Sequence, residues 1–189
     1  VPLPHQLAVD IGYLGEPKDE TDQQLVQHRL LYYPSKKNEA TGKSEKVNID
    51  EAQKVADLLN RIYTLTQKNF DPLRTVGVIV PYRNQIAMIR QEIEKTGNTA
   101  LKDVCIDTVE RYQGSQRDII IYSFTVQHRY QLDFLTSNSF YEDDKLIDRK
   151  LNVAITRARK QLIILGNKSI LSANPLFKAL IEQIPHHLR

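Results

Sequence analysis

Residues 119–124 read Ile-Ile-Ile-Tyr-Ser-Phe, a run without the polar and apolar alternation of a half-exposed strand. Such a run is typical of a strand buried on both faces of a parallel sheet. Residues 162–165, Leu-Ile-Ile-Leu, repeat the pattern nearer the C-terminus. Both runs are far shorter than the roughly 20 apolar residues of a membrane-spanning helix. The sequence therefore predicts a soluble domain built around a sheet that is covered on both sides.

Segments with strand and helix character alternate along the chain. The clearest helix begins at Asn48, because Asn48 and Glu51 have the spacing of a capping box and apolar residues follow at helical intervals. The expected strands are 29–33, 76–80, 104–106, 119–124 and 161–165, and the expected helices are 48–69, 82–94, 146–159 and 175–184. Alternation of this kind predicts a three-layer α/β fold, with a parallel sheet between helices on both faces.

Residues 1–27 have no clear period and contain several helix breakers, namely Pro2, Pro4, Gly12, Gly15 and Pro17. We expect them to form an irregular arm or connector, followed by one domain over residues 28–189. The chain begins with Val1 rather than Met, which leads us to expect a fragment or a processed part of a longer protein.

The composition excludes several classes of protein. The 189 residues suit one domain with a real core, and 41% hydrophobic and 26% charged residues argue against disorder. A net charge of +3 is too small to predict nucleic-acid binding by itself. The single cysteine, Cys105, excludes an internal disulfide and fits a reducing compartment, and the five histidines show no zinc-like spacing with it. We therefore expect no metal site built by this chain alone.

Residues 41–44, Thr-Gly-Lys-Ser, end like a phosphate-binding P-loop between a strand and a helix. The motif also requires a glycine five residues before Gly42, where this chain has Lys37. The following helix begins only near Asn48, whereas a P-loop lysine lies in the first helical turn. We therefore expect that the chain lacks a triphosphate cradle of its own.

Three other segments carry polar groups at the ends of expected strands. They are 78–85 (VIVPYRNQ), 107–118 (DTVERYQGSQRD) and 149–159 (RKLNVAITRAR). A helix start after a parallel strand attracts anions, and a glycine turn bares its backbone amides. Each segment alone is explained as well by ordinary structure: a tyrosine over the core, a polar turn, or a helix with basic edges.

Two arginines in the third segment are expected to have different tasks. On one helix, at about 100° per residue, Arg157 and Arg159 would lie roughly 200° apart. The two side chains could not easily serve one phosphate together. One could reach a ligand beyond the domain while the other forms a salt bridge.

Taken in this order and at these separations, the three segments resemble motifs IV, V and VI of superfamily 1 helicases. The branch is the one that holds senataxin, the nonsense-mediated-decay helicase and the replication helicase-nuclease. The match is best over residues 108–118 (TVERYQGSQRD) and 151–167 (LNVAITRARKQLIILGN), and it covers about residues 28–184. The resemblance implies the second RecA-like domain of such an enzyme.

The resemblance also implies roles for particular residues at a bound nucleotide. Arg157 would be the arginine finger that reaches the γ-phosphate, and Tyr82 would stack on adenine. Gln113 and Gly114 would lie at the phosphate side of the cleft. Gln116 stands where relatives often carry a ribose-binding acid.

Two further positions follow from the same resemblance. Some relatives have a phosphate-contacting arginine where this chain has Ile86, and Arg83 is the nearest substitute. Thr108 would lie near single-stranded DNA or RNA, held mainly through backbone phosphates.

The resemblance implies an ATP-dependent helicase or translocase whose first RecA-like domain holds ATP and Mg²⁺. The isolated chain is then expected to be inactive, and its compartment to be the cytoplasm, or the nucleus in a eukaryote. A non-catalytic nucleic-acid-binding or interaction module is the alternative. A flavodoxin-like cofactor protein is a weaker one, because the sequence shows no glycine-rich phosphate loop. Residues 127–145 are expected to be either disordered or a loop that faces nucleic acid.

Overall fold

The computed structural model describes the chain except for residues 1–3, 39–45, 113–114, 136–138, 143–144 and 185–189. Five strands form one sheet in the order β1-β7-β4-β2-β3, and every neighbouring pair is parallel. These strands are β1 (Leu30–Pro34), β2 (Val76–Val80), β3 (Cys105–Thr108), β4 (Arg117–Ser123) and β7 (Ala158–Gly166). Two further strands, β5 (Ser139–Glu142) and β6 (Lys145–Asp148), pair with each other antiparallel.

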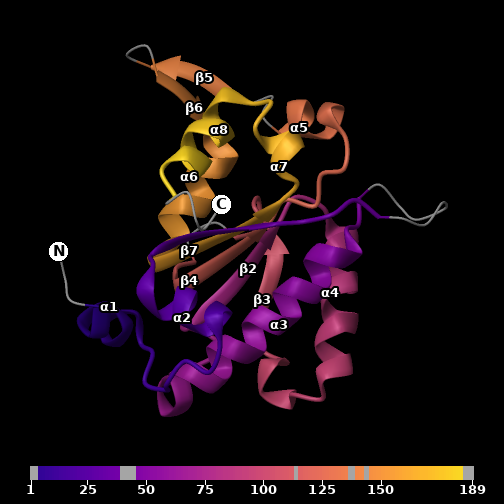
Figure 1. Cartoon of the computed structure of the whole chain (residues 1–189). Helices are drawn as coiled ribbons and strands as arrows, with labels where there is room; N and C mark the ends of the chain where they lie inside the picture. Colours follow the sequence, from indigo (N-terminus) through magenta and orange to yellow (C-terminus); the bar gives the residue numbers. More distant parts are fainter. Residues whose placement is uncertain (1–3, 39–45, 113–114, 136–138, 143–144, 185–189) are drawn as a thin grey trace.

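The helices cover both faces of the five-stranded sheet (Figure 1). They are α1 (Pro4–Ile11), α2 (Glu20–Gln27), α3 (Ile49–Thr66), α4 (Arg83–Thr96), α5 (Arg129–Leu135), α6 (Arg149–Arg157), α7 (Lys168–Leu171) and α8 (Pro175–Glu182), with short 3₁₀ turns at Gln67–Asn69 and Thr99–Leu101. The crossovers through α3 and α4 advance toward β3, whereas the one through α6 returns toward β1. Because parallel crossovers are right-handed, α3 and α4 lie on one face and α6 lies on the other.

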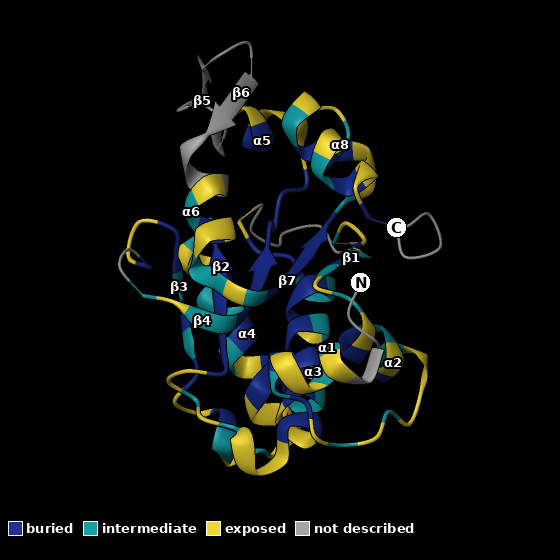
Figure 2. Cartoon of the chain, turned by 90° about the vertical axis from the view of Figure 1, so that its left-hand side faces the viewer, coloured by how far each residue is buried: buried dark blue, intermediate teal, exposed yellow. Residues whose placement is uncertain are grey.

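The core lies where the sheet meets these helices. Ile119, Ile120 and Ile121 of β4 are fully buried, as the unbroken apolar run predicts. Figure 2 shows the central strands as the buried interior and the outward sides of the helices as exposed. The predicted α/β class, a parallel sheet between two helical layers, is confirmed. No helix in the described ranges is long and apolar enough to cross a membrane.

The N-terminal residues differ from the expected irregular arm. Pro4–Ile11 and Glu20–Gln27 form α1 and α2 instead, residues 12–19 connect them, and both helices are anchored to the core through β7. The Tyr13 hydroxyl donates to Gln161 Oε1 at 2.6 Å, and Gln161 Nε2 donates to the carbonyl of Leu25 at 2.7 Å. Two eight-residue helices are too short to show a clear period, so their tertiary anchors are the stronger determinant.

The predicted helix over residues 146–159 is wrong at both ends. Residues 146–148 belong to β6, the helix α6 ends at Arg157, and Ala158 pairs with Arg117 at the start of β7. Sheet pairing therefore overrides the local helical pattern at this junction. Because Arg159 lies on a strand, the helical angle between Arg157 and Arg159 does not apply.

Parts of two other expectations fall outside the described residues. The P-loop lookalike at 41–44 lies there, as do Gln113 and Gly114. In the stretch 127–145, the described residues form α5, β5 and the start of β6.

Candidate functional site

The predicted site residues fall at two opposite edges of the sheet. Val80 pairs with Thr108 at the ends of β2 and β3, so Tyr82 and Thr108 lie at what we call the carboxyl edge. Gln116 precedes β4 and Arg157 precedes β7, so both lie at what we call the amino edge. The length of β4 separates the edges by roughly 20 Å, at about 3.3 Å per residue. The structure therefore brings Gln116 and Arg157 together and does not bring Tyr82 to them.

At the amino edge, the end of α6 meets the segment before β4. Gln116 Nε2 donates to the carbonyl of Thr156 at 3.2 Å, next to Arg157. Arg159 Nε lies 3.2 Å from Asp118 Oδ1 in an ion pair. The half-buried Arg157 differs, because its Nε is shielded from solvent and has no hydrogen-bond partner within the described residues. Arg159 is thus paired within the domain, whereas the guanidinium of Arg157 keeps a donor without a partner among the described residues.

The segment before Gln116 makes a close contact with the sheet. The segment between β3 and β4 crosses the face opposite α3 and α4, and Tyr112 in it is buried. A Cβ atom at Gly77 of β2 would lie only 1.6 Å from Tyr112 Oη. The contact therefore favours glycine at position 77, because any side chain there would force the Tyr112 ring to move.

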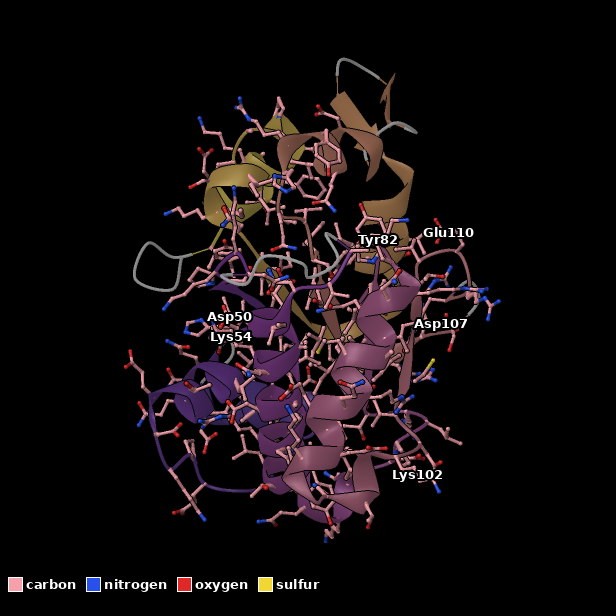
Figure 3. The ribbon with its side chains drawn as sticks, turned by 90° about the vertical axis from the view of Figure 1, so that its right-hand side faces the viewer. Asp50, Lys54, Tyr82, Lys102, Asp107 and Glu110 are labelled. Atoms are coloured by element: carbon pink, nitrogen blue, oxygen red, sulfur yellow. The ribbon has the colours of Figure 1, made fainter. Side chains whose placement is uncertain are left out.

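At the carboxyl edge, Tyr82 is the N-cap residue of α4 and Arg83 is its first, exposed residue. Lys46 Nζ lies 5.9 Å from the centroid of the Tyr82 ring, within the range of a cation–π contact. Thr108 is buried at the end of β3. Figure 3 shows Tyr82 at the start of α4 and Lys102, which precedes β3, toward the opposite end of that helix.

The carboxyl edge also contains a buried carboxylate, Glu51, that the sequence assigned to a different role. Asn48 caps α3 as predicted, accepting from the backbone N–H of Glu51 at 2.9 Å. The other half of the capping box is absent. Glu51 Oε2 accepts instead from Ser35 Oγ at 2.8 Å, and Oε1 accepts from Ser123 Oγ at 2.8 Å and from the Thr125 N–H at 2.9 Å. Glu51 thus ties the ends of β1 and β4 to the start of α3.

Gln85 completes this network from α4. Its Oε1 accepts from the Asn48 N–H and its Nε2 donates to the Asn48 carbonyl, both at 2.9 Å. The backbone N–H and carbonyl of Asn48 therefore form hydrogen bonds with Gln85 of α4, and not with Glu51. This pair joins the starts of α3 and α4, and the Gln85 N–H donates to the carbonyl of Tyr82 at 3.1 Å.

Burial raises the pKa of Glu51, and a hydrogen bond to Glu51 supports an unusual backbone conformation at Thr125. Burial raises the pKa of Glu51 to about 7, while hydrogen bonds from Thr125, Ser123 and Ser35 act in the opposite direction. Thr125 has φ of +66°, a left-handed conformation that is unfavourable for a β-branched residue. The hydrogen bond from the Thr125 N–H to Glu51 helps to hold this conformation.

The described residues hold no group of three or more His, Cys, Asp or Glu side chains that could bind a metal ion.

Comparison with known proteins gives a family and several relatives. Residues 9–169 match a family described as AAA domain. Relatives include Regulator of nonsense transcripts 1 of Dictyostelium discoideum, 39% identical over 57% of this chain and 8% of the relative. Probable helicase MAGATAMA 3 of Arabidopsis thaliana is 33% identical over 76% of this chain and 16% of the relative. Helicase sen1 of Schizosaccharomyces pombe is 32% identical over 84% of this chain and 9% of the relative.

The chain thus spans between 8% and 16% of the length of these relatives. Among solved structures, the C-terminal domain of a possible DNA helicase from Lactobacillus plantarum WCFS1 aligns with a TM-score of 0.47 and 14% identity. The alignment covers 85% of this chain and 83% of that one.

Proposed function

The chain belongs to the AAA-domain family, and we propose that it is the C-terminal motor domain of an ATP-dependent helicase or translocase. In the parent protein it supplies an arginine finger and part of the track for single-stranded DNA or RNA. The finger is Arg157. The helicases among its relatives support this proposal.

The contrast between Arg157 and Arg159 carries the assignment. Arg159 is neutralised by Asp118 within the domain, at 3.2 Å. Arg157 Nε is shielded from water and lacks a hydrogen-bond partner in the described part of the chain. A shielded donor without a partner is unfavourable, and a movement of this half-buried side chain toward an acceptor outside the domain would relieve the cost. Phosphate oxygens on a neighbouring domain would be such acceptors.

The chemical role of Arg157 is to stabilise charge on the phosphoryl group in transfer. ATP, with its Mg²⁺, is held mainly by a first RecA-like domain of the same parent chain. When the two domains close, the Arg157 guanidinium reaches the γ-phosphate, where charge develops in the transition state. Gln116 lies beside it and would face the nucleotide. The same role for Gln113 and Gly114 follows from the family resemblance alone. The isolated chain then has negligible ATPase activity.

We propose a division of the site residues that differs from the one implied by the family resemblance, because these residues lie at two separate edges of the sheet. Tyr82 and Arg83 lie with Thr108 at the carboxyl edge, whereas Arg157 and Gln116 lie at the amino edge. We assign the amino edge to the nucleotide, and the carboxyl edge to single-stranded nucleic acid. Tyr82 then stacks on a base of the strand rather than on adenine, and Arg83 faces a phosphate.

The decisive experiment replaces Arg157 in the full-length parent protein. Arg157→Ala is expected to lower ATP turnover at least about a hundredfold while ATP binding remains measurable, because a finger acts mainly in the transition state. Arg159→Ala is the matched control, since it removes a neighbouring arginine of the same edge, and its turnover should fall only a few-fold.

Near-normal turnover in Arg157→Ala would refute the finger. If the longest natural form of the protein hydrolyses no ATP, the non-catalytic nucleic-acid-binding module is the correct function.

A further inference from the structure

The start of α5 and the residue before it expose an aromatic pair, His128 and Tyr130, on either side of Arg129 in sequence. His128, Arg129 and Tyr130 are all exposed, and 57% of Tyr130 is accessible to solvent. The rings of His128 and Tyr130 are stacked, with centroids 5.4 Å apart and planes 9° from parallel. This pair lies outside the residues assigned above.

The neighbouring residues fix this turn to the domain. Gln131 is buried, and its Oε1 accepts from the backbone N–H of Gln127 at 2.8 Å and of His128 at 3.1 Å. Leu132 is buried in the core. Because both anchors point inward, the three preceding side chains are held on the outer surface. The ring pair is thus set in place before any ligand arrives, which lowers the ordering cost of binding.

The turn is joined to the carboxyl edge through the residues before α3. Gln127 Nε2 donates to the carbonyl of Val47 at 2.9 Å. The adjacent Lys46 lies over the Tyr82 ring. Figure 1 shows α5 beyond the carboxyl ends of the strands, near the start of α4. We call Tyr82, Lys46, Arg129 and the His128–Tyr130 pair together the aromatic strip.

The chemistry of the aromatic strip fits one class of ligand. Aromatic planes bind unstacked bases without regard to sequence, and nearby cations bind the phosphates between them. A duplex hides its bases in its own stack, so the ligand must be single-stranded. We propose that the His128–Tyr130 pair is a base-stacking platform that extends the single-strand track beyond Tyr82. This inference rests on the proposed function, whose track it lengthens.

The test measures binding of a fluorescein-labelled oligothymidylate to the full chain by fluorescence anisotropy at low salt. Tyr130→Ala is expected to weaken binding about tenfold, since stacking on an aromatic ring is worth that order of affinity per base. Tyr130→Phe keeps the ring and should stay within about twofold of the wild type. Tyr63→Ala is the matched control, because Tyr63 is an exposed tyrosine of α3, outside the aromatic strip, and should leave affinity unchanged.

The salt dependence of binding distinguishes the contribution of the Tyr130 ring from that of the Arg129 charge. Arg129→Ala should lower the slope of log affinity against log salt by about 0.7, as for one lost phosphate contact on a single strand. Tyr130→Ala should leave that slope unchanged. Thermal unfolding of Tyr130→Ala should match the wild type, because the side chain is mostly exposed.

Each contrary result has a distinct meaning. Wild-type affinity in Tyr130→Ala overturns the platform and leaves the Arg157 test untouched. An equal loss in Tyr63→Ala also overturns it, because the aromatic strip would then have no special role. If the wild-type chain binds no oligothymidylate or oligouridylate, both the platform and the proposed track are wrong.

Discussion

The two edges of the sheet satisfy their polar groups in opposite ways. At the carboxyl edge, one buried carboxylate, Glu51, collects three hydrogen bonds from neutral donors. At the amino edge, charged side chains pair with each other in contact with solvent, as in Arg159–Asp118 and Arg29–Asp10. The carboxyl edge is therefore stabilised by hydrogen bonds within the domain. The amino edge leaves Arg157 able to take a partner from outside.

The largest expected effect within the chain comes from removing the Glu51 carboxylate. Glu51→Ala leaves the donors of Ser35, Ser123 and Thr125 without their acceptor, which should lower the free energy of unfolding by about 3–5 kcal/mol. Glu51→Gln should cost about 1 kcal/mol, because its amide oxygen can face Ser123 and Thr125 while its NH₂ group donates to Ser35. Urea unfolding at pH 6 measures both. Equal losses in the two variants would show that the hydrogen bonds contribute little.

A somewhat smaller effect should follow pH. The pKa of Glu51 is raised from 4.5 to about 7, so the folded state keeps a proton that the unfolded state releases. The resulting stability is fully present below pH 4.5 and is lost as pH rises through about 7. A shift of this size corresponds to about 3 kcal/mol in the free energy of unfolding.

The charged groups around Glu51 do not obscure this window. Asp50 beside it contributes a smaller upward effect, and Asp50 is itself paired with Lys54 and accepts from the Lys36 N–H. Asp10 and Asp19 have pKa values lowered by hydrogen bonds from Arg29 and Arg61, so their contribution is lost only as pH falls below 3.8. Urea unfolding between pH 4.5 and 8 should show the decline in the wild type and a flatter profile in Glu51→Gln. A decline of the same size in both proteins would exclude Glu51 as its source.

The smallest effects should distinguish the functions of the two edges. In the parent protein, Tyr82→Ala should weaken oligonucleotide binding about tenfold and leave the KM for ATP unchanged. Gln116→Ala should raise that KM a few-fold, by loss of one hydrogen bond, and leave oligonucleotide binding unchanged. Steady-state kinetics and anisotropy measure the two pairs of values. The reverse pattern would return Tyr82 to the nucleotide site.

Local patterns predicted the parts of the fold that depend on neighbours in sequence. The apolar run of β4 and the Asn48 cap of α3 are both confirmed, because burial on two faces and helix capping leave direct traces in sequence. The junction at Ala158 was mispredicted, because pairing with Arg117 across the sheet decides where α6 ends. A local pattern contains no information about that partner.

The sequence predicts candidate site residues but not how the fold groups them. Motif order placed Tyr82, Thr108, Gln116 and Arg157 in one list, whereas strand direction divides them between two edges. The sequence indicates Glu51 only as part of a helix cap, because its partners Ser35, Ser123 and Thr125 are distant in sequence. The His128–Tyr130 pair leaves an H-R-Y signal, but its exposure depends on the burial of Gln131 and Leu132.

The contact of Tyr112 with Gly77 has a mechanical consequence. The strand β2 supports the segment that carries Gln116 at one end and leads directly into Tyr82 at the other. All five of its residues are buried, and close packing along the whole strand makes it rigid. Under the proposed function, a displacement at one end of β2 would be transmitted to the other end, which would couple the nucleotide side of the domain to its nucleic-acid side.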